Sequence, residues 1–316
     1  MKKYSIGIDL GGTKILAGIV NTETGEVIAH AKKRTKVQAK KGSDTLIKRV
    51  IKTIESAIAG SNIPINEIEK IGIGVPGQVD REKGILISAP NLYTYDLNFK
   101  KILSEHFGIN VIVSNDVDVA TIGEHKFGAG VGYNSAVCVF VGTGVGAGII
   151  QDGKIWTGAA GTAGEIGHII VDSGGRPCAC GGSGCLEAYA SRTAIEKKIL
   201  AQLKKGHKSS IEVSEDGVIR SNSIKEAVEN NDELVISALN EAAEYLSCGL
   251  ASVVNFLNPE VIILGGGLIE AVDYFYDLTV KKTRAKALPV PAQKMKIIKT
   301  KLGDFSGIIG AAMLEE

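Results

Sequence analysis

Residues 5–14 read Ser-Ile-Gly-Ile-Asp-Leu-Gly-Gly-Thr-Lys, and this stretch predicts how the chain begins to fold. The apolar residues up to Leu10 are typical of a short buried strand, and the glycines after them predict a turn. Residues 15–20 are apolar again and predict a second strand, and the polar run 21–25 predicts a turn before a third. The stretch therefore indicates a β-hairpin whose glycine-rich turn exposes backbone N–H groups that a phosphate can approach.

The same pattern returns near the middle of the chain. Residues 136–141 are apolar and predict a strand, Gly142-Thr143-Gly144 predicts a turn, and residues 147–150 predict the strand that follows. Two halves that each open with a hairpin and a Gly/Thr turn indicate a duplicated α/β unit. In such an arrangement we expect the ligand to bind in a cleft between the two halves.

Helices and further strands fill the rest of each half. Apolar residues recur at helical spacing from Leu46 to Ile58, with Ser43 or Asp44 as the expected cap and Gly60 near the end. The same reasoning predicts further helices over 97–107, 194–205, 233–257 and 307–314, and strands over 70–75, 111–113 and 261–264.

Three of the five cysteines lie within eight residues, at Cys178, Cys180 and Cys185, and His168 precedes them. Thiolates and a neutral imidazole are ligands that tetrahedral Zn²⁺ prefers, and four of them fill a closed structural site. A disulfide, or three small buried residues, are the alternatives. The first residues lack the apolar core of a secretory signal, so we expect a cytoplasmic protein, in which clustered cysteines are more often metal ligands than disulfides. Cys138 and Cys248 lie in apolar stretches and are expected in the core.

Length and charge limit the possible functions. A chain of 316 residues can hold two domains with cores of their own. Its 36 basic and 35 acidic residues give a net charge of +1, so we expect neither a nucleic acid nor a membrane surface as a partner. The basic run 32–36, with Lys40 and Lys41, could contact phosphates, but a solvated edge strand and loop is the favoured interpretation. The uncharged stretch 136–150 is shorter than the roughly 20 residues that span a bilayer.

The glycine-rich turns do not fit the common nucleotide-binding fingerprints. Neither of the first two turns has the eight-residue Walker spacing, and neither precedes a helix as a dinucleotide turn does. Gly265-Gly266-Gly267 follows a strand and mimics the start of a dinucleotide fingerprint, but no ribose-binding acid lies at the usual distance, which argues against a dehydrogenase. Asp9 precedes the first turn by two residues, where a carboxylate could hold Mg²⁺ through waters.

Three motifs together resemble the ROK family of repressors, open reading frames and kinases. They are Asp9-Leu10-Gly11-Gly12-Thr13-Lys14, Gly164-Glu165-Ile166-Gly167-His168, and the run from Cys178 to Glu187. The resemblance covers essentially the whole chain. It implies the actin-like, ribonuclease H-like fold of sugar kinases, with two α/β domains and a cleft that binds ATP and the sugar. We expect residues 1–118, completed by a C-terminal helix 303–316, as one domain, and residues 119–302 as the other.

The resemblance also implies roles for single residues. Asp116 matches the catalytic base, and Asp118 is its nearby competitor. The residues that match sugar contacts are Gly77, Asn91, Asn115, Asp116, Glu165, His168 and Glu187. Those that match contacts to ATP are Asp9, Gly11, Gly12, Thr13, Lys14, Gly142, Thr143, Gly144, Gly265, Gly266 and Gly267. The matching ligands of a structural Zn²⁺ are His168, Cys178, Cys180 and Cys185.

The activity that the resemblance implies is ATP-dependent phosphorylation of a hexose at its 6-hydroxyl, with Mg²⁺, and with glucose as the favoured substrate. N-acetylmannosamine, N-acetylglucosamine, fructose and allose are the alternative sugars, because pocket walls rather than shared hydroxyl ligands decide among them. Some members of the family are sugar-responsive repressors with a DNA-binding domain before the kinase-like body. The early position of the first strand and the near-neutral charge argue against that function here. By analogy with the family we expect a homodimer, or a tetramer.

Overall fold

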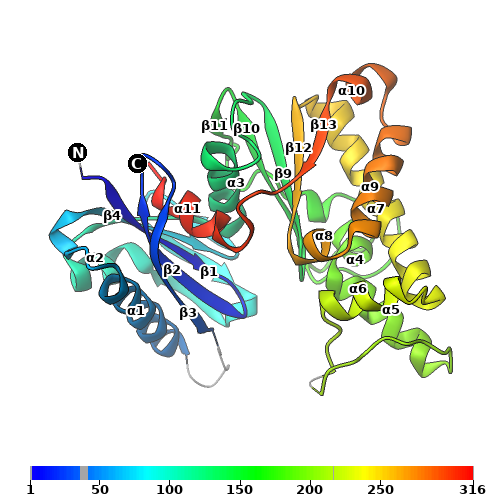
Figure 1. Ribbon diagram of the computed structural model, residues 1–316, viewed down its shortest axis with the longest axis horizontal. Helices are drawn as coiled ribbons and strands as arrows, with labels where there is room; N and C mark the ends of the chain where they lie inside the picture. The colour runs from blue at the N-terminus through cyan, green and yellow to red at the C-terminus, as the bar shows by residue number, and fades with distance from the viewer. Residues whose placement is uncertain (1, 36–41, 216, 316) are drawn as a thin grey trace. The chain divides into compact units, whose positions relative to one another are not determined.

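The computed structural model describes residues 2–35, 42–215 and 217–315, except for the side chain of Asn91. The chain divides into two compact units, and each is described by itself. The first consists of Met1–Asn134, Gly148–Ala163 and Lys301–Glu316, and the second of Ser135–Ala147 and Gly164–Thr300. The predicted mixed α/β class is confirmed (Figure 1). The expected domains, 1–118 with 303–316 and 119–302, stay a prediction.

A five-stranded sheet in the order β3-β2-β1-β4-β8 forms the centre of the first unit. Its strands are β1 (Tyr4–Leu10), β2 (Lys14–Asn21), β3 (Val27–Arg34), β4 (Ile68–Val75) and β8 (Asn110–Asn115). The hairpin strands β1, β2 and β3 pair antiparallel, whereas β1, β4 and β8 run parallel. Residues 32–34 lie in β3, which is the predicted edge strand, and Lys36, Lys40 and Lys41 lie outside the described residues.

Helices α1 (Gly42–Ser61), α2 (Phe99–Phe107), α3 (Asp116–Phe127) and α11 (Ser306–Ala312) accompany this sheet (Figure 1), and their apolar side chains belong to two separate clusters. Apolar side chains of α1 and α2 share one cluster with β1, β4 and β8. Those of α3 and α11 form the other. The C-terminal helix α11 lies directly on the sheet backbone: a Cβ on Gly7 would be 1.8 Å from the carbonyl oxygen of Ile308, and one on Gly72 would be 1.7 Å from that of Ala311. Any side chain at these glycines would push the helix off the sheet.

A small antiparallel sheet of three strands, β5 (Gln78–Asp80), β6 (Ile85–Ala89) and β7 (Thr94–Asn98), was not predicted from the sequence. It also corrects one helix boundary. Leu97 belongs to β7, and α2 begins only at Phe99, because the side chain of Asn98 accepts the backbone N–H of Lys101 at 2.8 Å and caps the helix. In α1, Ser43 and Asp44 lie inside the first turn, so the prediction that one of them is the cap was wrong.

The second sheet has the order β11-β10-β9-β12-β13. Its strands are β9 (Ala136–Val141), β10 (Val145–Gln151), β11 (Lys154–Ile155), β12 (Val261–Gly265) and β13 (Lys296–Lys299). Strands β9, β12 and β13 are parallel, as β1, β4 and β8 are. Both sheets therefore place the hairpin strands first and two further parallel strands beyond them, which agrees with the predicted duplication.

The helices that accompany the second sheet are α4 (Glu187–Ala190), α5 (Arg192–Lys204), α6 (Ser221–Glu229), α7 (Glu233–Leu257), α8 (Gly267–Ala271), α9 (Asp273–Lys286) and α10 (Pro289–Lys294). Helix α7 matches its predicted bounds, because its apolar residues keep helical spacing between the Asp232 cap and Asn258 in the left-handed region. Cys138 is fully buried in β9, as predicted, and Cys248 is partly buried in α7. Among the described residues, no helix is both long and apolar enough to cross a membrane.

Candidate active site

Three parallel strands of the first unit end at the same edge of their sheet. Asp9 near the end of β1 pairs with Gly74 of β4, and Val75 of β4 pairs with Asn115 of β8. Since ligands of open α/β sheets bind at the carboxyl ends of the strands, this edge is where a site is expected. The topology therefore brings together the predicted residues Asp9, Gly77 and Asn115.

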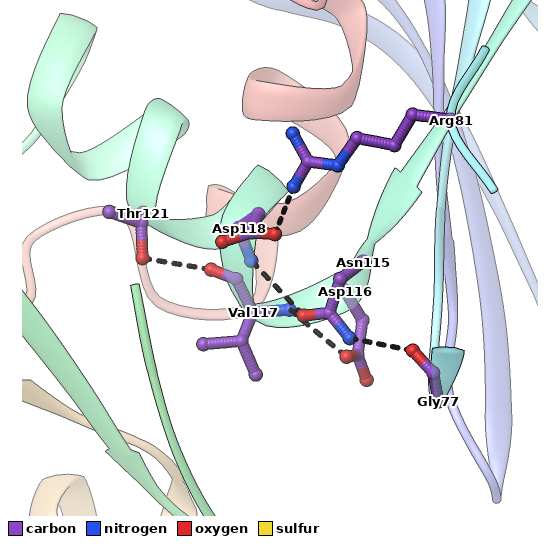
Figure 2. A network of polar contacts seen from close by, with 7 residues as sticks. All are labelled: Gly77, Arg81, Asn115, Asp116, Val117, Asp118 and Thr121. Atoms are coloured by element: carbon purple, nitrogen blue, oxygen red, sulfur yellow. Dashed lines mark hydrogen bonds and ion pairs between the residues drawn. The ribbon is translucent and has the colours of Figure 1, made fainter. Parts of the chain in front are cut away.

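Asn115 fixes the geometry of this edge through both ends of its side-chain amide (Figure 2). Its oxygen caps α3 by accepting the backbone N–H groups of Val117 at 2.8 Å and Asp118 at 3.4 Å. Its nitrogen donates to the carbonyl oxygen of Gly77 at 3.2 Å. Gly77 has a φ of +96°, and a Cβ there would lie 2.1 Å from the carbonyl oxygen of Ser88, so only glycine fits this turn.

Asp116 is the first residue of α3 and carries a carboxyl group with a strongly raised pKa. One of its oxygens accepts the backbone N–H of Val117 at 3.0 Å (Figure 2). Burial raises the pKa of Asp116 to about 7, and the nearby carboxylates of Asp9 and Asp118 add to the rise. Burial also raises the pKa of Asp9, although Lys14 opposes that shift. A carboxylate that titrates near neutral pH has the property that a general base requires.

Asp118, the competitor for the role of base, is engaged elsewhere. Its buried carboxylate forms an ion pair with the guanidinium of Arg81, which follows β5 (Figure 2). The pairing of Asp118 with a cation leaves Asp116 as the better candidate for a proton acceptor. Arg81 was not singled out from the sequence, where it lies 37 positions before Asp118.

The first glycine-rich turn, Gly11–Lys14, is closed by a hydrogen bond from the Gly11 N–H to the carbonyl oxygen of Lys14 at 2.8 Å. Thr35, a fully buried residue that the sequence did not reveal, fastens the turn from behind. Its hydroxyl donates to the Gly11 carbonyl at 2.7 Å, and its N–H donates to the Thr13 carbonyl at 2.9 Å. The ammonium of Lys14 lies 2.6 Å from the carboxylate of Asp304. A Cβ on Gly12 would meet no heavy atom of the described residues within 4 Å, so the space in front of the turn is open.

Asn91 lies in the short 3₁₀ turn Pro90–Leu92, between β6 and β7. Its side chain lies outside what the structure describes, and its predicted contact with the sugar stays a prediction.

The four predicted metal ligands of the second unit converge. The ligand atoms of His168, Cys178, Cys180 and Cys185 all lie within 4.8 Å of one another. The Nδ1 atom of His168 is 3.8 Å from the sulfur of Cys178, and the sulfurs of Cys180 and Cys185 are 3.7 Å apart, without a disulfide. Tetrahedral zinc with Zn–S bonds of about 2.3 Å separates neighbouring ligand atoms by about 3.8 Å. Burial raises the pKa of the Cys185 thiol to about 12, so a thiolate at this position requires a cation beside it.

The loop that carries the cysteines is anchored by Tyr189 on α4. The phenol donates to the carboxylate of Asp172 at 2.7 Å and accepts the backbone N–H of Arg176 at 2.6 Å. The Arg176 guanidinium lies over the same ring, 4.6 Å from its centroid, and pairs with Glu241 of α7 at 2.8 Å. These contacts join the cysteine loop to the helix that begins with Glu187, a connection that the sequence did not reveal.

Glu187 and Glu165 flank the cluster, as predicted. One carboxylate oxygen of Glu187 accepts the backbone N–H of Val145, directly after the second glycine-rich turn, Gly142–Gly144, at 2.9 Å. A Cβ on Gly144 would lie 2.3 Å from that oxygen. A carboxylate oxygen of Glu165 lies 4.0 Å from Nε2 of His168, the ring nitrogen that faces away from Cys178.

The glycine-rich turn Gly142–Gly144 follows β9, and Gly265–Gly267 begins at the end of β12. The two segments lie beside each other, because β9 and β12 are neighbouring parallel strands. The turn is closed by a bond from the Gly142 N–H to the Gly144 carbonyl at 2.9 Å. Gly265 ends β12 and pairs with Phe140 of β9. Gly266 has a φ of +91°, and a Cβ there would lie 2.5 Å from the carbonyl oxygen of Val141, so the fold itself requires this glycine. The predicted residues of this unit thus form two groups, one at the cysteine loop and one at the glycine turns, joined by Glu187.

Comparisons of the sequence and of the structure with known proteins all point to the same protein family. The sequence model of the ROK family matches residues 5–316. A glucokinase of Halalkalibacterium halodurans is 33% identical over 99% of this chain and 94% of that protein. The crystal structure of a ROK family glucokinase from Streptomyces griseus in complex with glucose and AMPPNP has a TM-score of 0.84 at 30% identity, and the match covers 98% of each chain. A xylose repressor of Caldicellulosiruptor bescii is 32% identical over 96% of this chain and 76% of that protein.

Proposed function

The chain belongs to the ROK family, and on that premise we propose that it transfers the terminal phosphoryl group of ATP to the 6-hydroxyl of a hexose, with glucose as the preferred substrate. The fold is the actin-like two-domain fold of ROK sugar kinases. Support for the substrate comes from a glucokinase that matches over nearly the full length of both chains. Support for the chemistry comes from Asp116, which directly follows β8 and whose pKa is raised by burial to about 7.

In this proposal Asp116 accepts the proton of the 6-hydroxyl while that oxygen attacks the γ-phosphorus of ATP. The new O–P bond forms as the bond to the bridging oxygen breaks, and ADP leaves with its electron pair. Since Asn115 caps α3 and also contacts Gly77, the helix turn that carries Asp116 is held in place before substrate binds. The base is therefore pre-positioned, which reduces the entropic cost of bringing the reacting groups together.

The hexose hydroxyls are assigned to Gly77, Asn91, Asn115, Asp116, Glu165, His168 and Glu187. Amide and carboxylate groups suit this task, because each can form paired hydrogen bonds with neighbouring hydroxyls. His168 would coordinate the metal through Nδ1, which faces Cys178, and offer Nε2 to a sugar hydroxyl. The metal ligands and the sugar ligands would then share one side chain.

The nucleotide phosphates are assigned to the turns Gly11–Lys14 and Gly142–Gly144, and the adenosine to Gly265–Gly267. Gly12 and Gly142 support this assignment, because neither has a positive φ and a Cβ on either would meet no heavy atom of the described residues within 4 Å. The fold does not need glycine at these two positions, whereas a close approach of phosphate does. The side-chain carboxylate of Asp9 accepts no hydrogen bond from the described residues, and it could hold the waters of Mg²⁺.

The cysteine cluster fits a structural Zn²⁺. Its donor set of three sulfurs and one imidazole nitrogen is one that zinc accepts, and the separations of 3.7 and 3.8 Å suit a tetrahedral site. When bound, the ion would supply binding free energy that stabilises a loop rich in glycine. The loop in turn positions His168, with Glu165 and Glu187 on either side of it.

A phosphorylation assay across candidate sugars tests the proposal. Glucose, N-acetylmannosamine, N-acetylglucosamine, fructose and allose are each offered with ATP and Mg²⁺, and ADP release is followed by a coupled assay. We expect the highest kcat/KM with glucose and a product phosphorylated at the 6-position by ³¹P NMR. A higher kcat/KM with another of these sugars would overturn glucose as the substrate, and no ADP release with any of them would overturn the kinase.

Three further expectations belong to the same proposal. A homodimer, or a tetramer, is tested by light scattering on the purified protein. Residence in the cytoplasm is tested by fractionation of cells that express the chain. The absence of a nucleic-acid partner is tested by gel shift, since the family also includes repressors such as the one in Caldicellulosiruptor bescii; salt-sensitive, sequence-specific binding to DNA would contradict it.

A further inference from the structure

Arg81 is a charged residue of the candidate site, and the proposed function gives it no role. It directly follows β5, and its guanidinium reaches Asp118 in the first turn of α3 (Figure 2). The side chain of Asp118 is only 7% exposed and that of Arg81 is 26% exposed, so the pair lies largely out of water. A charge pair in such surroundings is screened less than one at the surface.

The Arg81–Asp118 ion pair is one of two contacts between the segment 77–81 and the start of α3. Asn115 donates to the carbonyl oxygen of Gly77 at 3.2 Å, just before β5, and Asp118 binds Arg81, just after β5. Asp116 lies between these two residues on the first turn of α3. The hairpin segment 77–81 is thus attached on both sides of the candidate base.

The ion pair between Arg81 and Asp118 also sets the net negative charge around Asp116. Three carboxylates gather here, since Asp9 on β1 and Asp118 on α3 both act on Asp116. Arg81 is the cation that pairs with Asp118. If the guanidinium were absent, the charge of Asp118 would act on Asp116 without compensation.

We propose that Arg81 is a positioning residue for phosphoryl transfer: its ion pair with Asp118 holds the first turn of α3 against β5 and neutralises the carboxylate beside Asp116. The inference rests on the proposed function, because it assumes that Asp116 is the base. It adds a residue that acts through Asp118 and touches no substrate.

Other charged groups of the first unit do not replace Arg81. Among the described residues, α11 and β8, which both pack on α3, carry no charged side chain. Strand β4 carries Glu69 and Lys70 at its start, away from the end where Val75 pairs with Asn115, and β11 carries Lys154. On β2, Lys14 is bound to Asp304.

The test measures how the Asp116 carboxyl group titrates in four proteins: the unmodified chain, Arg81→Gln, Asp118→Asn and the double variant. The ¹³Cγ resonances of labelled aspartate are followed by NMR against pH, with Asp116→Asn used to assign the signal. Arg81→Gln should raise the pKa of Asp116 by about one unit, and Asp118→Asn should lower it by a similar amount. The double variant should titrate close to the unmodified chain, because it lacks both charges of the neutral pair.

The kinetic arm records the pH dependence of kcat/KM for glucose in the same proteins. The rise in activity should move to higher pH in Arg81→Gln and to lower pH in Asp118→Asn. Arg81→Lys keeps the positive charge and should restore the titration of the unmodified chain. Lys83→Gln, which removes an exposed ion pair with Asp80 on the same hairpin, is the matched control and should leave the titration unchanged.

The outcomes separate this inference from the proposed function. If the titration of Asp116 fails to shift in opposite directions in the two single variants, Arg81 does not act through Asp118 and the inference is overturned, even if the chain is an active kinase. If the titration shifts as expected but Asp116→Asn retains its activity, the role of Arg81 in catalysis is overturned together with Asp116 as the base. If Arg81→Gln fails to fold, the shift in Asp118→Asn and its loss in the double variant decide.

Discussion

The carboxylate of Glu187 accepts the backbone N–H of Val145 at 2.9 Å, so a residue assigned to the sugar is bonded to the turn assigned to the phosphates. The fit is close, because a Cβ on Gly144 would lie 2.3 Å from the same carboxylate oxygen. A sugar hydroxyl that engages Glu187 would therefore act on a group that already holds the second phosphate turn. Sugar binding and nucleotide binding should depend on each other through this one side chain.

Two substitutions at Glu187 separate its two contacts. In Glu187→Gln the amide oxygen can still accept the Val145 N–H, but the charge is lost, so we expect a glucose KM raised about tenfold and an ATP KM close to that of the unmodified chain. In Glu187→Ala the N–H loses its partner, and both KM values should rise. Steady-state kinetics with each substrate varied in turn measure the difference. Equal ATP KM values in the two variants would show that the bond to Val145 has no effect on the nucleotide.

Replacement of Asp116 by Asn should remove the proton acceptor and keep the shape of the site. We expect kcat to fall by about 10²–10⁴-fold, which is the range that general base catalysis contributes, while the dissociation constant for glucose changes little. Coupled ADP release gives kcat, and calorimetric titration with glucose gives the dissociation constant. A variant with near-normal kcat would show that another group takes the proton.

The raised pKa of Asp116 predicts how activity depends on pH. The carboxyl group is protonated below a pH of about 7 and cannot accept a proton there, so kcat/KM should rise with pH through an apparent pKa of about 7. A profile of kcat/KM from pH 5 to pH 9 measures this. A profile that is flat over this range, as an ordinary aspartate pKa of 3.8 would give, would contradict the assignment.

The same shift has an opposite effect on stability. Because burial raises the pKa of Asp116 from 3.8 to about 7, the folded chain holds this proton more tightly than the unfolded chain. The stabilisation is complete below the unfolded pKa and is lost as the pH rises through the folded one. Relative to the unmodified chain, Asp116→Asn should therefore be more stable at pH 8 than at pH 4. Urea unfolding of both proteins at the two pH values gives the comparison.

Removal of the metal should weaken the fold and the sugar site together. Cys180→Ser, or a strong chelator, should lower the melting temperature and raise the glucose KM, because the loop that ends at Glu187 loses its fixed shape. Elemental analysis should find about one zinc ion per unmodified chain. Cys248→Ser, on α7 and outside the cluster, is the matched control and should keep the metal. Loss of zinc without any change in glucose KM would separate the metal from the active site.

Alanine substitutions test the two phosphate turns. A methyl group at Gly12 or Gly142 has open space in the free protein, so Gly12→Ala and Gly142→Ala should change the free energy of unfolding by no more than about 0.5 kcal/mol. The ATP KM should nevertheless rise at least tenfold, since the methyl group occupies the place of a phosphate oxygen. Gly266→Ala is the contrasting variant. Its Cβ would lie 2.5 Å from the Val141 carbonyl oxygen, and it should lose stability even without ATP.

Local patterns in the sequence were enough to predict the two hairpins, the long helix α7 and the convergence of the metal ligands. Buried strands and amphipathic helices have periodicities that short stretches display, and three cysteines with a histidine limit the chemistry. The sheet β5-β6-β7 was missed because its strands are short and partly exposed, so no long apolar run marks them. Its last strand includes Leu97, which the apolar spacing predicts as part of the helix that follows.

Long-range contacts of the site could not be predicted from one sequence. Arg81 meets Asp118 across 37 positions, and Thr35 meets Gly11 across 24, and neither residue belongs to a motif. A charged residue after a short strand and a threonine beside a basic run are both common on protein surfaces. Only the arrangement of β1, β3, β5 and α3 brings these side chains to the candidate site, and burial then makes their polar contacts important.

The contact between α11 and the first sheet has a consequence for synthesis on the ribosome. Gly7 and Gly72 lie against the backbone of residues 308 and 311, so the part of the sheet at these glycines stays uncovered until residues 306–312 have been translated. A nascent chain that stalls before residue 306 would expose the glycine-lined face to chaperones and proteases. Premature stop codons immediately before the codon for Ser306 should therefore reduce protein abundance as strongly as those far upstream.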